Sequence, residues 1–222
     1  MEQENRFESQ AALIVGGASG TGFAIARRLG TEGARVMLVD HDGAAGESCA
    51  NALDSMGIEG RLVIGDPADP AVSTFAVRSA VQIWGRLDVL VTLATGAGLE
   101  SPSWETPVEV FDRVYATNMR GLFLFAGAAV PWMLKRGYGR IVCVVPHAPG
   151  GGARRAAFSA TAAGVGGMVK SLAKELAGSG VLANCVAGDG GSAEAAASAA
   201  AFLASPECTF TTGSVWYAGG GG

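Results

Sequence analysis

The stretch AALIVGGASGTGFAIARRL, Ala11 to Leu29, places a short apolar run directly before a glycine-rich turn and a helical pattern. Glycines at this point let the backbone turn sharply and bring a helix N-terminus against a pyrophosphate. The free N–H groups and the dipole of that helix favour negative charge. The residues that we expect to form this phosphate cradle are Gly16, Ser19, Gly20, Thr21 and Gly22.

The next apolar run ends at Asp40, 18 residues after Gly22. A carboxylate there can accept hydrogen bonds from both hydroxyls of an adenosine ribose, and it would repel a 2′-phosphate. The alternative is a structural turn followed by a strand-end Asp. Because the strand, the glycine spacing and Asp40 agree, the pattern favours a dinucleotide site that prefers NAD over NADP, with His41 beside the adenine.

Short β-type runs alternate with helical runs along the whole chain, which is typical of a parallel sheet covered on both faces. The expected strands are Ala11 to Val15, Ala34 to Asp40, Arg61 to Asp66, Leu87 to Leu93, Arg140 to Val145, Val181 to Val186 and Gly213 to Ala218. No linker divides the chain. We therefore expect one α/β domain over residues 1–222, a doubly wound Rossmann-type fold with a seven-stranded parallel sheet.

Composition excludes several classes of function. The net charge is −4, and Lys and Arg are dispersed along the chain, so we expect no basic patch that could bind nucleic acid or an anionic membrane. Four irregularly spaced cysteines and two histidines form no zinc pattern, so we expect buried thiols and no metal. The N-terminus lacks an apolar signal core, and the longest apolar run is too short for a membrane span and contains Pro131. We expect a cytoplasmic protein.

The motifs beyond the glycine loop resemble the short-chain dehydrogenase/reductase family over nearly the whole chain. They are EGARVMLVD, Asp66, LDVLV, Asn118 in TNMRG, GRIV, KSLAKEL and the pattern FLAS…TGSVW. The resemblance implies that Asp66 lies beside the adenine and that Ala94 contributes to the cofactor site. It also makes Asn118 the fourth member of the family's catalytic set, where it mainly holds a helix bend and a water.

The departures from the family pattern concentrate around the expected reaction centre. The family's Asn-Asn-Ala-Gly corresponds to the segment from Thr92 to Thr95, and its Ser-Ser corresponds to Val145 and Pro146. Its Tyr-x-x-x-Lys aligns with Phe158 and Ala162, in a helix expected from Ala156 to Leu176. The resemblance therefore implies that the groups that polarise and protonate a carbonyl are missing.

The segment that covers the substrate in the family is expected to be shortened here, because a helical pattern begins almost directly after Asp189. We expect a deletion near residues 189–195, an open pocket, and NAD binding that is weakened or absent. The residues expected to line the substrate pocket are Thr95, Pro146, Arg154, Phe158, Thr161 and Asp189. His147 is the candidate general acid or base, since imidazole titrates near neutral pH; the alternative is an exposed loop histidine.

Three functional interpretations remain open. The favoured one is a repurposed enzyme that performs a non-redox step, such as dehydration, isomerisation or cyclisation, on a small molecule. The others are a catalytically silent subunit that pairs with an active relative, and an NAD(H)-dependent oxidoreductase with an atypical acid. Long apolar helices favour a homodimer or homotetramer, or a hetero-oligomer with an active relative.

Overall fold

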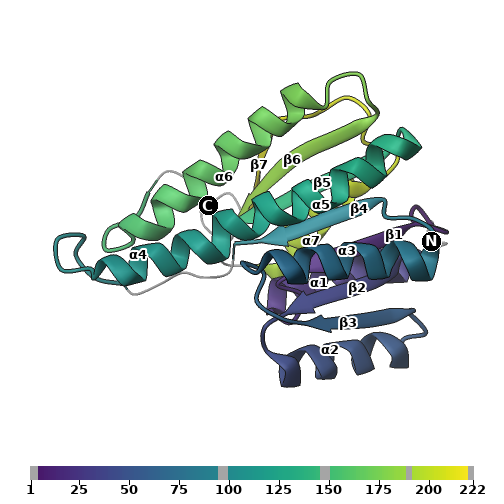
Figure 1. The fold of residues 1–222 in the computed structure, drawn as a ribbon, viewed down its shortest axis with the longest axis horizontal. Coiled ribbons are helices and arrows are strands. Elements are labelled where there is room, and N and C mark those ends of the chain that lie inside the picture. The colour runs from purple at the N-terminus through teal and green to yellow at the C-terminus, as the bar shows by residue number, and fades with distance from the viewer. Residues whose placement is uncertain (1–4, 95–99, 146–150, 189–191, 220–222) are drawn as a thin grey trace.

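The computed structural model describes residues 5–94, 100–145, 151–188 and 192–219. Its centre is a seven-stranded sheet in which every neighbouring pair is parallel, in the order β3-β2-β1-β4-β5-β6-β7 (Figure 1). The strands are β1 (Ala11–Val15), β2 (Arg35–Asp40), β3 (Gly60–Ile64), β4 (Val89–Leu93), β5 (Gly139–Val145), β6 (Val181–Gly188) and β7 (Val215–Ala218).

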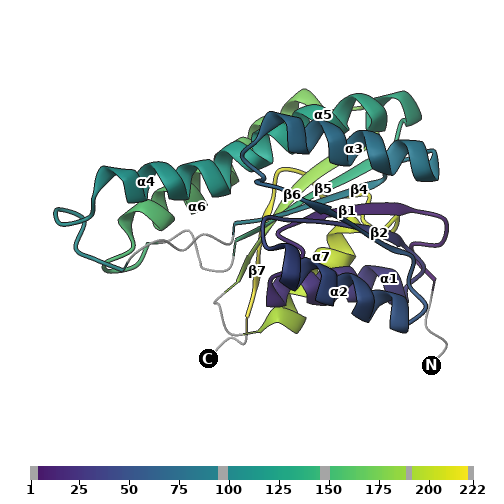
Figure 2. The same cartoon turned by 60° about the horizontal axis from the view of Figure 1, so that its bottom comes forward.

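Helices cover both faces of this sheet (Figure 2). One face carries α3 (Pro70–Trp84), α4 (Val108–Tyr115), a π-helical turn η1 (Ala116–Arg120), α5 (Gly121–Arg136) and α6 (Ala156–Glu175). The other face carries α1 (Gly20–Thr31), α2 (Gly43–Ser55) and α7 (Ala193–Ala204). The doubly wound single-domain fold expected from the sequence is therefore confirmed.

The strands lie where the sequence predicts them, with ends that differ by at most two residues. This agreement has a physical cause: central parallel strands are buried on both faces and read as continuous apolar runs. All residues of β1, β4 and β5 are buried, and they separate two apolar clusters, one under each layer of helices.

The strand order reverses between β1 and β4, so the chain leaves these neighbouring strands toward opposite faces of the sheet. Ligands of open α/β sheets bind beside such a switch point, outside the carboxyl ends of the strands. In Figures 1 and 2, α4 and the start of α6 extend beyond this edge. The fold thus places the glycine loop and the first turns of α6 at the same edge of the sheet.

An ion pair between buried Asp88 and half-buried Arg86 holds the opposite, amino edge together. Asp88 precedes β4 and is fully buried; it accepts hydrogen bonds from the Arg86 guanidinium at 2.6 and 2.8 Å. It also accepts the backbone N–H of Ala11 at 2.9 Å. This carboxylate therefore joins the start of β1 to the start of β4, far from the carboxyl edge.

We predict that Asp88→Asn lowers the free energy of unfolding by about 2 kcal/mol, because the Arg86 guanidinium loses its ionic partner in a buried site. Urea unfolding followed by circular dichroism measures the change. The matched control is Glu194→Gln, which breaks the exposed Arg27–Glu194 pair and should cost less than about 1 kcal/mol. Equal effects of the two substitutions would contradict the assigned role of Asp88.

Candidate functional site

The glycine loop between β1 and α1 closes through two hydrogen bonds of Ser19. Its hydroxyl donates to the carbonyl oxygen of Gly16 at 2.8 Å and accepts the backbone N–H of Gly22 at 3.0 Å, which caps the helix. Gly16 has φ +81°, a conformation that favours glycine. A Cβ on Gly22 would lie 2.1 Å from the carbonyl oxygen of Gly16. Gly22 is therefore required by the close approach of the helix to the loop.

Gly20, the first residue of α1, differs in this respect. Among the residues that the structure describes, a Cβ at Gly20 would meet no heavy atom within 4 Å. Packing within the chain therefore does not explain this glycine, whereas an anion in front of the helix N-terminus would, since it must approach the backbone closely. The loop fits a pyrophosphate, and half-buried Thr21 follows Gly20 in the first turn.

Asp40 at the end of β2 fixes the loop from the side. Its Oδ2 accepts the backbone N–H of Ala18 at 2.9 Å, and its Oδ1 accepts that of Asp42 at 3.2 Å. The carboxylate is nearly buried, and His41 Nδ1 lies 3.2 Å from Oδ1. The structure thus brings Asp40 and the phosphate cradle together, as the sequence predicts. The hydrogen bond from Ala18 could not be predicted from the sequence, because its donor is a backbone N–H group.

Asp66 lies two residues after β3, and Ala94 directly follows β4. Asp66 is exposed and its Oδ1 accepts the backbone N–H of Ala68 at 2.8 Å. Ala94 is buried and its N–H donates to the carbonyl oxygen of Val144 in β5 at 2.9 Å. Both residues lie at the carboxyl edge, as an adenine-side and a cofactor-side position require.

Phe158 and Ala162 lie in the apolar core. Phe158 is 2% exposed and Ala162 is 1% exposed, and both belong to the cluster that includes Val110 and Val114 of α4. A ligand could reach little of either side chain. These two positions join α6 to α4 and place no titratable group at the surface of the site.

Asn118 lies inside the π-helical turn η1, where one extra backbone residue widens the helix. Its Nδ2 donates to Oγ1 of Thr161 at 3.2 Å, and that hydroxyl donates to the carbonyl oxygen of Phe158 at 2.9 Å. Asn118 and Thr161 are both buried. These bonds link η1 to the first turns of α6, a connection that the sequence does not indicate.

Arg154 and Arg155 lie directly before α6, where the segment contacts residues that follow β4. The Arg154 carbonyl oxygen accepts the N–H of Ser101 at 3.0 Å, and Arg155 forms an ion pair with Glu100. Arg154 itself has φ +64°, which is unusual for a residue with a side chain. Nothing in the sequence indicates the pairing with Glu100, because the two segments lie far apart in the chain.

Four of the expected site residues, Thr95, Pro146, His147 and Asp189, lie outside the described residues. Elsewhere in the chain, burial raises the pKa of the Cys143 thiol and raises that of Cys185 to about 12. All four cysteines are free, and Cys49 is the only partly exposed one. Within the described segments no group of His, Cys, Asp and Glu could hold a metal ion, and no helix could span a membrane.

Several known proteins align with most of this chain. It is 35% identical to 2-dehydro-3-deoxy-L-rhamnonate dehydrogenase (NAD(+)) from Sphingomonas sp. strain SKA58, over 97% of this chain and 96% of that protein. It is 34% identical to the BbsD subunit of (2S)-[(R)-hydroxy(phenyl)methyl]succinyl-CoA dehydrogenase from Thauera aromatica, over 81% of this chain and 72% of that one. The alignment with the Sphingomonas enzyme spans 243 positions, so at least 21 of them are gaps in this chain of 222 residues.

These relatives correct the functional expectation drawn from the sequence. Both are named as dehydrogenases, and the first is named for NAD(+). The expectation of a repurposed enzyme with a non-redox reaction is therefore wrong, and the comparisons point to redox chemistry. The physical reason is that the absence of certain side chains at one site is not evidence for a different reaction.

The fold and the family agree with these relatives. A crystal structure of levodione reductase superposes with a TM-score of 0.89 over 95% of this chain and 96% of that one, at 25% sequence identity. A family model described as short chain dehydrogenase matches residues 10–201. The chain therefore belongs to the short-chain dehydrogenase family.

Proposed function

We propose that the protein is an NAD(H)-dependent oxidoreductase that acts on a hydroxyl or carbonyl group of a small molecule and uses an atypical proton donor. The observation that carries this proposal is the intact loop in front of α1, where Gly20 leaves open space that chain packing does not need. The names of relatives that align with most of the chain support it.

In this proposal the adenosine half of the cofactor site keeps its contacts. The N-terminus of α1 binds the pyrophosphate, Asp40 accepts the ribose hydroxyls, and Asp66 lies beside the adenine. The bound nicotinamide supplies or accepts the hydride. The nicotinamide half is weakened, because Thr92, Leu93 and Ala94 replace the family's Asn-Asn-Ala and no lysine follows Phe158 by one helical turn.

Proton transfer needs a group other than the family's Ser, Tyr and Lys. Those three are absent in this proposal, since Val145, Phe158 and Ala162 stand in their places. His147, just after β5, is the candidate acid, because an imidazole can exchange a proton near neutral pH. We also place the missing segment between β6 and α7, where the chain passes from Gly188 to Ala193 in a few residues. The site is then open to water.

A second candidate function is a non-catalytic subunit of a dehydrogenase. The burial of Phe158 and Ala162 favours it, because the pair that would carry a phenol and an ammonium forms core packing instead. The relative from Thauera aromatica is itself named as a subunit. Such a chain would bind a cofactor or a partner without turning over on its own.

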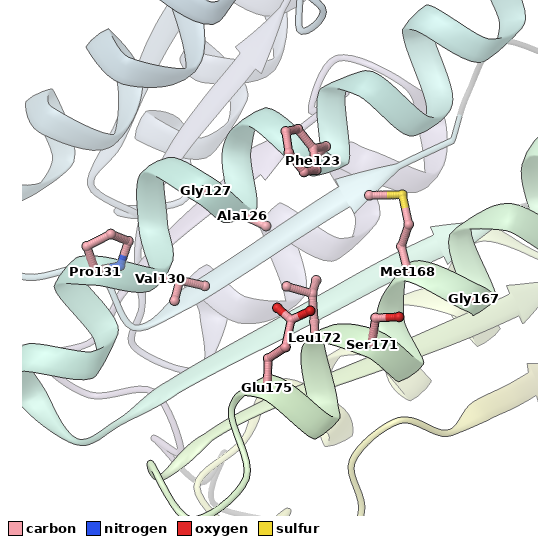
Figure 3. A pocket seen from close by; sticks show the side chains of 10 residues that line it. All are labelled: Phe123, Ala126, Gly127, Val130, Pro131, Gly167, Met168, Ser171, Leu172 and Glu175. Carbon is pink, nitrogen blue, oxygen red and sulfur yellow. The ribbon is translucent and has the colours of Figure 1, made fainter.

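Either function is compatible with pairing between copies of the chain through α5 and α6, which we propose as the assembly surface. A groove of about 680 Å³ runs between these helices, lined by Phe123, Gly127, Val130, Gly167, Met168 and Leu172 (Figure 3). A Cβ on Gly127 or Gly167 would meet nothing within 4 Å in the described parts of the same chain. Glycine inside a helix costs about 1 kcal/mol relative to alanine, so close approach of a second copy accounts for both.

We predict that Gly20→Ala weakens NADH binding at least about tenfold, since the new methyl group occupies space that the pyrophosphate needs. Calorimetric titration with NADH measures the dissociation constant. The matched variant is Gly22→Ala, which should instead lower the melting temperature because its Cβ would collide with the Gly16 carbonyl oxygen. Unchanged NADH affinity in a folded Gly20→Ala protein would contradict the cradle.

Turnover separates the two candidate functions. We predict slow reduction of NAD(+) or oxidation of NADH with the substrates named by the relatives, 2-dehydro-3-deoxy-L-rhamnonate and levodione. In the absence of a tyrosine acid, kcat should be about 10²–10⁴ below that of the matching relative assayed in parallel. His147→Ala should remove the remaining rate and leave NADH affinity unchanged. NADH binding with no turnover on any substrate would support the subunit instead.

For the assembly surface we predict that Phe123→Glu converts the oligomer to smaller species, because it places a charge in an apolar interface. Light scattering coupled to size-exclusion chromatography measures the mass. Phe75→Glu on α3 is the matched control: Phe75 is 62% exposed and Phe123 68%. A monomeric wild-type protein, or equal effects of the two variants, would refute this surface.

A further inference from the structure

Arg154 carries a positive charge that the described part of the chain does not neutralise. Its neighbour Arg155 forms an ion pair with Glu100. The side chain of Arg154 is exposed, and its Nη2 donates to the backbone carbonyl oxygen of Glu100 at 3.5 Å, at the limit of a hydrogen bond. Among the described residues no carboxylate pairs with Arg154, so one guanidinium remains without a negative partner there.

The backbone holds Arg154 in a conformation that disfavours a side chain. Its φ is +64°, in the left-handed region where a Cβ is crowded by the backbone. The carbonyl oxygen of Arg154 accepts the N–H of Ser101 at 3.0 Å, which ties the residue to the segment that follows β4. Glycine adopts this conformation without strain. The turn therefore does not explain the arginine, whereas a role for its guanidinium does.

The position is also unfavourable for a cation. Arg154 and Arg155 lie directly before α6, and the N-terminus of a helix is the positive end of its dipole. The first turn of α6 contains no acidic residue, and no side chain caps it. Two cations there destabilise the helix, and Glu100 offsets the charge of one of them. A further anion beside Arg154 would offset the charge of the other.

Arg154 lies on the side of the sheet where a ligand is expected. The start of α6 extends beyond the carboxyl edge, the edge at which open α/β sheets bind their ligands (Figures 1 and 2). Arg154 precedes Phe158 by four residues, about one helical turn. It stands at the outer end of α6, so an anion bound there belongs to the part of a ligand that lies away from the sheet.

We propose that the substrate of this protein carries a carboxylate and that the Arg154 guanidinium binds it. A guanidinium presents parallel N–H donors that match the two oxygens of a carboxylate. Glu100 keeps Arg155 paired and leaves Arg154 to the substrate. This inference rests on the proposed oxidoreductase function, and it adds the substrate class, a small carboxylic acid with a hydroxyl or oxo group, together with the residue that selects it.

The test compares 2-dehydro-3-deoxy-L-rhamnonate with its methyl ester, which keeps the carbon skeleton and loses the negative charge. Calorimetric titration without cofactor measures both dissociation constants in the absence of turnover. The wild-type protein should bind the carboxylate at least about tenfold more tightly than the ester, which is the size expected of a charge-assisted hydrogen bond. Separate titration with NADH tests the cofactor site.

The main variant is Arg154→Gly, which removes the guanidinium and the backbone strain together. It should lose the preference for the carboxylate while its melting temperature stays equal or rises, a combination that a purely structural role would not give. Arg154→Lys keeps the charge and should retain part of the preference. The matched control is Arg78→Gln, because Arg78 is an exposed arginine on α3 and its loss should leave both dissociation constants unchanged.

The outcomes separate this inference from the proposed function. If NADH binds but the wild-type protein does not prefer the carboxylate, or Arg154→Gly keeps that preference, the role of Arg154 is refuted and the cofactor site stands. If NADH does not bind, the proposed function fails, and the inference about its substrate fails with it.

Discussion

The close approach of α1 to the end of β1 is the constraint on which the rest of the carboxyl edge depends. Gly22 leaves no room for a side chain beside the carbonyl oxygen of Gly16, and Ser19 bonds to both residues. The N-terminus of α1 therefore lies beside the switch point between β1 and β4. Asp40 then fixes the loop through the N–H of Ala18, so the glycine loop and the end of β2 form one connected unit.

The fold could be predicted almost completely from the sequence, and so could the position of the glycine loop beside Asp40. Buried parallel strands give long apolar runs, and a glycine loop followed by Asp40 is a specific pattern for a dinucleotide site. The remaining contacts could not be predicted, because they join segments far apart in the chain. No periodic pattern in the sequence indicates the Asn118–Thr161 hydrogen bond, the Arg155–Glu100 ion pair or the π-helical turn.

The functional error has a similar origin. Phe158 and Ala162 mark the loss of a phenol and an ammonium only by alignment with the family, and the structure places both side chains in the core that joins α4 to α6. An apolar pair there stabilises the two helices without any titratable group. An apolar pair at these two positions says nothing about whether a hydride is transferred. The relatives supply that part of the argument.

The Asp88–Arg86 ion pair lies at the amino ends of the strands, at the opposite edge of the sheet from the glycine loop. The ion pair that secures the scaffold is thus spatially separate from the candidate site. Substitutions in the loops at the carboxyl rim therefore leave the ion pair at the amino rim intact. The chemistry at the carboxyl rim and the folding stability of the domain can therefore vary independently of each other.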